Sequence, residues 1–247
     1  FVNTKNHYRS GVDDALLWAA PGFILTGIYF ANSIGPLSNA ILVLILAFYL
    51  TMRFADRLMA LVAAVALLAV IFFSFVQMGN VARNILPFVL MMASAVIYFS
   101  SKKLVIFPAA KFYQKCLTVT QITGLVCFFL SGNYYVVREA SVEYFGLQLT
   151  AIEGIPFVWI FWIFTVAIPL VYIFWAVLKK DIILIRTGLL LVAAMVFTIR
   201  YYNYTMPLET LMIIGGLLLT AIAYLLIKYL KEPKAGFTSE VINDSKY

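Results

Sequence analysis

Histidine and cysteine are nearly absent from this chain, which excludes several kinds of site. Its 247 residues include one histidine, His7, and two cysteines, Cys116 and Cys127. A haem held between helices needs a pair of histidines, and a histidine-based metal site needs more than one imidazole, so neither is predicted in the apolar part of the chain. A serine–histidine catalytic pair is excluded there as well. The cysteines lie about 16 Å apart along one predicted helix and cannot form a disulfide.

Charged side chains are also scarce. They make up 12% of the residues, whereas hydrophobic side chains make up 64%. A water-soluble globule needs more polar surface than this, so we predict an integral membrane protein. The apolar runs are continuous and lack the alternation of a barrel strand, which predicts an all-α fold.

Eight apolar stretches are long enough to cross a bilayer as helices. Their predicted limits are 15–32, 37–54, 58–78, 84–101, 112–133, 155–178, 182–200 and 207–230. The chain then consists of a cytoplasmic entry segment, 1–14, a transmembrane helical bundle, 15–230, and a disordered cytoplasmic tail, 231–247. Because the chain begins with Phe1 and no signal-peptide core follows, we expect further sequence before it.

Lysine and arginine are distributed unequally between alternate loops. Eight spans place fifteen of these residues on the side of the N-terminus and three on the other side, namely Arg83, Arg138 and Arg200. Cytoplasmic loops carry the excess of positive charge in membrane proteins, so both ends of the chain are predicted to be cytoplasmic. The formal charge of +7 therefore follows from membrane topology, and no nucleic-acid partner is predicted.

Prolines mark the outer ends of the even-numbered spans. Pro36, Pro87, Pro156 and Pro207 each lie near the predicted first turn of a span, where a missing N–H costs the helix nothing. The pattern predicts four helical hairpins that turn on the outer side. Each pair of prolines is 51 residues apart, which permits a doubling of a four-helix unit with parallel halves.

Small residues and internal prolines indicate how the spans pack. The span 58–78 carries Ala60, Ala63 and Ala64, which would allow a neighbouring helix to approach closely. Pro169 lies inside the span 155–178 and is expected to kink it. The long outer loop, 134–154, mixes apolar and charged residues, so we expect it to form a short interfacial helix or to cap the bundle.

Arginine and tyrosine are concentrated where the odd-numbered spans end on the outer side, in QMGNVARN, SGNYYVVRE and TIRYYNYTMPLE. If these spans are neighbours, their ends would form a shallow polar pocket with glutamates as counter-charges. Its candidate residues are Arg83, Arg138, Arg200, Tyr134, Tyr135, Tyr201, Tyr202, Glu139, Glu153 and Glu209. A bidentate arginine contact would suit an anionic lipid headgroup or small anionic solute.

An interfacial belt is the alternative interpretation of the same residues, and the sequence favours it. Tyrosines gather at the level of the headgroups, and arginines bind phosphates there. Glu209, near the start of the last span, would complement the helix dipole.

Catalytic and ion-coupling motifs are missing. The chain has no phosphate-binding glycine loop, zinc-protease motif or nucleophile elbow. No span has an ionisable residue near its centre, which disfavours ion-coupled transport. We therefore predict no enzyme, cofactor or metal site. The leading prediction is a membrane subunit or scaffold that packs against a membrane-protein partner or its own copies. The alternative is a protein that binds or transports a lipid headgroup or small anionic solute at the outer rim.

Several stretches together resemble one group of proteins. KNHYRSGVDDALLW, NYYVVREASVEYFG, IRTGLLLVAAMVFTIRYYNYTMPLE and KEPKAGFTSE are similar to bacterial multi-pass inner-membrane proteins of the domain-of-unknown-function kind. The resemblance implies a bacterial cytoplasmic membrane. It assigns no activity and no functional residue.

Overall fold

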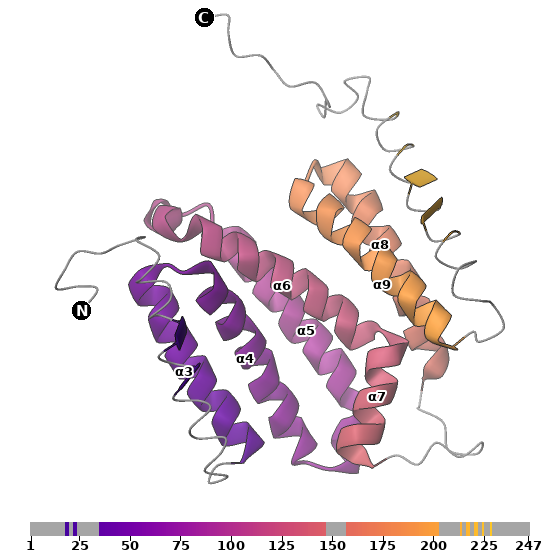
Figure 1. Cartoon of the computed structure of the whole chain (residues 1–247), viewed down its shortest axis with the longest axis horizontal. Helices are drawn as coiled ribbons and strands as arrows, with labels where there is room; N and C mark the ends of the chain where they lie inside the picture. The colour runs from indigo at the N-terminus through magenta and orange to yellow at the C-terminus, as the bar shows by residue number, and fades with distance from the viewer. Residues whose placement is uncertain are drawn as a thin grey trace, which may run out of the picture. The chain divides into compact units, whose positions relative to one another are not determined.

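The computed structural model contains α-helices and a 3₁₀ turn, and no strand, in the residues that it describes. These residues are 35–146 and 157–202, with short pieces at 18–19 and 22–23 and single or paired positions between 213 and 228. The all-α prediction is confirmed for this part of the chain (Figure 1). The chain divides into two compact units, Phe1–Gly124 and Leu125–Tyr247.

Six of the described helices are long and apolar enough to cross a membrane, which confirms a multi-pass membrane protein. They span Pro36–Phe54, Arg57–Val76, Ala82–Leu104, Ala110–Gly132, Val158–Lys179 and Ile182–Tyr202. Each corresponds to a predicted span. The first and last predicted spans, 15–32 and 207–230, lie largely outside the described residues, so the count of eight stays a prediction.

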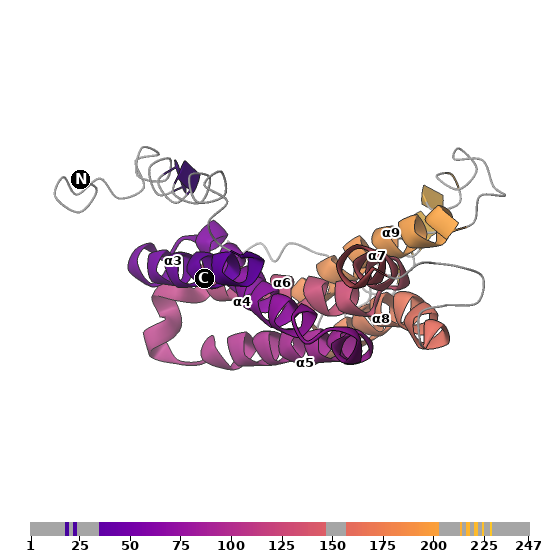
Figure 2. The same ribbon diagram turned by 90° about the horizontal axis from the view of Figure 1, so that it is seen from below.

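The first unit contains α3 (Pro36–Phe54), α4 (Arg57–Val76), α5 (Asn80–Leu104), the 3₁₀ helix η1 (Pro108–Tyr113) and the beginning of α6 (Gln114–Gly132). Helix α4 packs against both α3 and α5 (Figures 1 and 2). Pro36 begins α3, as the sequence predicts. The small residues Ala60, Ala63 and Ala64 are buried, which confirms their predicted role in close packing.

The second unit contains the end of α6, followed by α7 (Tyr134–Phe145), α8 (Val158–Lys179) and α9 (Ile182–Tyr202). Helix α8 packs against α7 and, more extensively, against α9. Pro169 lies inside α8, as predicted, and is buried, while the kink expected there stays a prediction. The beginning of the long loop forms the helix α7, while its interfacial position stays a prediction. The rest of that loop lies largely outside the described residues.

A two-residue turn of the same design joins α3 to α4 and α8 to α9. The first residue, Ala55 or Lys180, adopts a left-handed conformation with φ of 52° or 57° and ends one helix. The second residue, Asp56 or Asp181, accepts hydrogen bonds from backbone amides of the next helix. These turns connect the most extensively packed helix pair of each unit. Both turns lie on the predicted cytoplasmic side, so the four outward-turning hairpins stay a prediction.

The predicted role of Pro87 as a helix start was wrong. Helix α5 begins at Asn80, directly after Gly79, so Pro87 lies inside the helix. Gly79 has a φ of 73° and reverses the chain direction, which lets the helix begin well before the proline. Proline then removes the hydrogen bond to the carbonyl of Arg83 without ending the helix. Pro156 and Pro207 lie outside the described residues.

Candidate functional site

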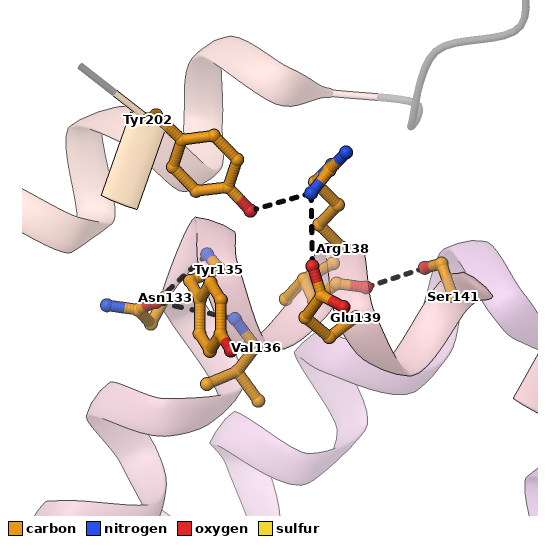
Figure 3. A network of polar contacts seen from close by, with 8 residues as sticks. Asn133, Tyr135, Val136, Arg138, Glu139, Ser141 and Tyr202 are labelled. Atoms are coloured by element: carbon orange, nitrogen blue, oxygen red, sulfur yellow. Dashed lines mark hydrogen bonds and ion pairs between the residues drawn. The ribbon is translucent and has the colours of Figure 1, made fainter. Parts of the chain in front are cut away.

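Asn133 makes a sharp corner between α6 and α7. It is the only residue between these helices, and its backbone is extended, with φ −78° and ψ 127°. Its side-chain Oδ1 accepts hydrogen bonds from the amides of Tyr135, at 3.0 Å, and Val136, at 3.4 Å (Figure 3). This is the N-cap contact that an asparagine provides to a helix start. The corner therefore determines where α7 begins and which side chains its first turn presents.

Buried hydroxyl groups connect this corner to α8 and α9. The Asn133 Nδ2 donates to Thr198 Oγ1 of α9 at 3.0 Å. The amide of Tyr134 donates at 3.0 Å to Thr165 Oγ1 of α8, which in turn donates to the Phe161 carbonyl. Asn133, Thr165 and Thr198 are at most 3% exposed. Since an unsatisfied buried polar group is costly, these bonds hold the start of α7 in one orientation.

Six aromatic side chains surround the first turn of α7 and form a group that we call the tyrosine cluster. Its members are Tyr134, Tyr135, Trp162, Phe197, Tyr201 and Tyr202. The Tyr134 ring stacks on Trp162 of α8 with centroids 5.0 Å apart, and Tyr202 of α9 lies equally close to Tyr134. Tyr135 meets Tyr201 edge to face at 4.7 Å. The cluster thus combines side chains from three helices.

Arg138 lies one helical turn after Tyr134 and contacts the cluster through Tyr202. Its Nη1 is 3.0 Å from Glu139 Oε1 and donates a hydrogen bond to the Tyr202 hydroxyl at 3.4 Å (Figure 3). Its guanidinium carbon is 5.3 Å from the centre of the Tyr202 ring, within the range of a cation–π contact. The hydrogen bond to Tyr202 raises the pKa of the Arg138 guanidinium above its usual value. The group is therefore cationic at any physiological pH.

One edge of the Arg138 guanidinium has no hydrogen-bond partner among the described residues. The contacts to Glu139 and Tyr202 both use Nη1, which leaves the Nε and Nη2 donors without a hydrogen-bond partner among these residues. The Arg138 side chain is 27% exposed. Two parallel N–H donors on one edge of a guanidinium match the spacing of two oxygens of a phosphate or carboxylate.

The structure brings together six of the ten predicted site residues. Arg138, Glu139, Tyr134, Tyr135, Tyr201 and Tyr202 lie in this one region of the second unit. Arg200 is half-buried in the last turn of α9, two positions before Tyr202. Arg83 belongs to the first unit, where its Nε is 3.5 Å from Asn84 Oδ1, so its convergence with the others stays a prediction. Glu153 and Glu209 lie outside the described residues.

Sequence reasoning missed the residues that support the site, namely Asn133, Trp162, Thr165 and Thr198. Asn133 had a usable signal, because an asparagine between an apolar run and a polar helical segment is a typical N-cap. The threonines and the tryptophan had none, since single hydroxyl groups and aromatic rings within apolar spans are common. Within the described part of the chain, no group of three or more His, Cys, Asp and Glu residues is arranged to hold a metal ion.

Comparison with known proteins finds no matching family model, no matching curated protein and no matching solved structure.

Proposed function

We propose that this protein binds an anionic group, a phosphate or carboxylate, of a lipid headgroup or small solute at Arg138. The open Nε and Nη2 edge of a guanidinium held in place by Tyr202 and Glu139 carries this proposal. A bidentate contact is among the strongest that a side chain offers to such oxygens. The proposal further takes the membrane to be a bacterial inner membrane and α7 to lie on its outer side.

The support beneath Arg138 favours a binding site over an interfacial belt. Belt tyrosines gain free energy from the headgroup layer itself and need no partners on other helices. Here the first turn of α7 is held by buried hydrogen bonds to Thr165 and Thr198. In addition, the Tyr134 ring stacks on Trp162. Such support reduces the entropy that a binding side chain loses when its ligand arrives.

Glu139 acts in this proposal as the counter-ion of the empty site. Its side chain is 43% exposed, and an ion pair in such surroundings contributes only about 0–1 kcal/mol. A bound anion adds contacts to Nε and Nη2 without displacing Glu139 from Nη1. The carboxylate nevertheless repels the ligand, so neutralising it should strengthen binding.

The geometry gives less support to a scaffold that packs against other membrane proteins. A scaffold of this kind is expected to expose a stripe of small residues to its partner. Ala60, Ala63 and Ala64 of α4 are instead buried within the first unit. The large exposed side chains of α8, such as Trp159 and Phe174, suit hydrocarbon chains as well as they suit another protein.

Binding can be measured through Trp162, which lies in the cluster 5.9 Å from the Tyr202 ring. The purified protein in zwitterionic nanodiscs would be titrated with short-chain phosphatidylglycerol and, separately, with inorganic phosphate while tryptophan fluorescence is recorded. A signal that disappears in Trp162→Phe comes from this site. Response to the lipid alone indicates a headgroup ligand, and response to both indicates a phosphate site.

Two arginine variants make this titration decisive. Arg138→Gln should weaken binding at least about tenfold, because a hydrogen-bonded charge is worth about 1.5–3 kcal/mol. Arg83→Gln in the first unit is the matched control and should bind normally if Arg138 acts alone. Weaker binding by Arg83→Gln as well would support the predicted convergence of the arginines. Unchanged binding by Arg138→Gln would refute the proposal, and no titration in the wild type would refute it for phosphate ligands.

A further inference from the structure

The connection from α5 to α6 exposes large apolar side chains in the first unit. Ile106, Phe107 and Phe112 are 80%, 60% and 87% exposed, respectively. They flank or belong to η1, which lies beyond the end of α5. Exposure of this size at the end of a helical bundle needs an apolar environment to be favourable.

The same connection is fixed to the turn between α3 and α4. The Tyr113 hydroxyl donates to the Met52 carbonyl at 2.7 Å. Three residues later, Cys116 Sγ donates to the Ala55 carbonyl at 3.0 Å and is almost completely buried. The exposed side chains are therefore carried by a segment whose end is held in place.

Positive charge is present on both segments that these contacts join, the α3–α4 turn and the α5–α6 connection. The ends of α3, α4, α5 and α6, together with η1, contribute six exposed cations, which are Arg53, Arg57, Lys102, Lys103, Lys111 and Lys115. Asp56 is the one carboxylate among residues 35–124, and it accepts a hydrogen bond from the Met59 amide at 2.9 Å. Among the described residues of this unit, one carboxylate therefore faces an excess of cations, and Lys102 also donates a hydrogen bond to the Tyr98 hydroxyl at 3.1 Å. We call these cations together with Ile106, Phe107 and Phe112 the basic–apolar surface.

We propose that the basic–apolar surface binds anionic phospholipids of the leaflet at this end of the first unit. Its cations contact headgroup phosphates, while Ile106, Phe107 and Phe112 insert between the acyl chains just below. A surface that mixes basic residues with exposed aromatic and aliphatic side chains is typical of interfacial lipid binding. Clustered lysines and arginines next to membrane spans also select anionic over zwitterionic headgroups.

Charge complementarity and position both favour lipid as the occupant. The six cations lie at the ends of membrane-spanning helices, the level at which phosphates are present at high local concentration. The exposed aromatic rings project from the same segment as Lys111, so one surface offers contacts to headgroup and acyl chain together. An acidic protein segment would satisfy the charges but would not by itself cover Phe112.

Lipid retention tests this proposal in the intact protein. The protein is reconstituted in nanodiscs that contain equal amounts of phosphatidylglycerol and phosphatidylcholine, extracted in mild detergent, and analysed for retained lipid by mass spectrometry. We expect phosphatidylglycerol to be enriched at least about fivefold, and the enrichment to fall at high salt. A quadruple variant should lose most of this enrichment. Its substitutions are Lys102→Gln, Lys103→Gln, Lys111→Gln and Lys115→Gln.

Controls separate this surface from general charge effects. Lys179→Gln, Lys180→Gln removes two exposed lysines of the second unit and should keep the enrichment. Phe107→Ser, Phe112→Ser keeps every charge and should reduce the total lipid retained. The four lysine substitutions should remove the same share of the enrichment in an Arg138→Gln background, so failure of either proposal can be recognised without the other.

Three results would overturn the proposal. The first is that the wild type retains the two lipids in equal amounts. The second is that substitution of Lys179 and Lys180 lowers the enrichment as much as substitution of the four lysines. The third is that an acidic protein copurifies in a stoichiometric amount and is not displaced by phosphatidylglycerol.

Discussion

Asn133 and Thr198 lie 65 residues apart in the sequence and are hydrogen-bonded to each other inside the second unit. The asparagine caps α7, and the threonine belongs to α9, whose end carries Tyr202. The position of Arg138 therefore depends on a polar pair that never touches the proposed ligand.

Asn133→Ala should destabilise the protein by about 2–3 kcal/mol, because the cap and the buried bond to Thr198 are lost together. Thr198→Val keeps the shape and should cost about 1 kcal/mol. Thermal unfolding in detergent measures both. Thr118→Val is the control, since that hydroxyl is exposed and bonds only to the Gln114 carbonyl of its own helix. A double variant whose loss equals the sum of the single losses would show that the pair is not coupled.

The left-handed turn residues provide a second prediction. Ala55→Gly and Lys180→Gly should each stabilise the protein by about 0.5–1 kcal/mol, because glycine adopts positive φ without the clash of a Cβ atom. Chemical unfolding in mixed micelles would measure the change. Ala47→Gly, at a buried position inside α3, should have the opposite sign. Equal destabilisation by all three would argue against these turn conformations.

Two glycines lie at close contacts between helices, and their substitution by alanine should change the stability of the protein by different amounts. A Cβ atom on Gly124 would lie 3.0 Å from the Ser94 carbonyl oxygen and 3.1 Å from the Tyr98 amide nitrogen, both backbone atoms. On Gly188 its nearest neighbour would be Ile173 Cγ1, at 2.9 Å, which belongs to a side chain that can change rotamer. We expect Gly124→Ala to cost about 2–3 kcal/mol and Gly188→Ala less. Melting temperatures in the same detergent would rank them.

Orientation in the membrane can be tested with introduced thiols. Glu139→Cys should react with an impermeant maleimide in intact cells, whereas Lys103→Cys should react only after the membrane is opened. The native Cys116 is buried and Cys127 is half-buried, so the wild type provides the background. Labelling of the Lys103→Cys thiol from outside would show that the orientation in the membrane is the opposite of the predicted one.

The sequence predicted those parts of the fold that depend on solvent and periodicity. The span predicted at 182–200 is the helix Ile182–Tyr202, and the one predicted at 58–78 is Arg57–Val76. These helices follow from the continuous apolar runs that a hydrocarbon environment requires. The sequence also predicted that Tyr134 and Tyr202 lie together, because both residues are at the ends of spans that run in the same direction. The two rings are indeed in contact.

Contacts between particular side chains could not be predicted in this way. The bonds of Asn133 to Thr198 and of Tyr134 to Thr165 depend on which faces of α8 and α9 meet α7. An apolar run in a membrane gives little information about its rotation, since lipid and protein both accept leucine and valine. The start of α5 was missed because Gly79, rather than Pro87, determines it.

The one-residue corner at Asn133 leaves the chain no slack between α6 and α7. Each residue of an α-helix advances the side-chain direction by about 100°. Inserting or deleting a single residue between the cap and Arg138 would swing the guanidinium roughly a quarter-turn away from Tyr202 while the helix itself survived. The length of this short segment, more than its composition, is the quantity that any redesign of the protein must preserve.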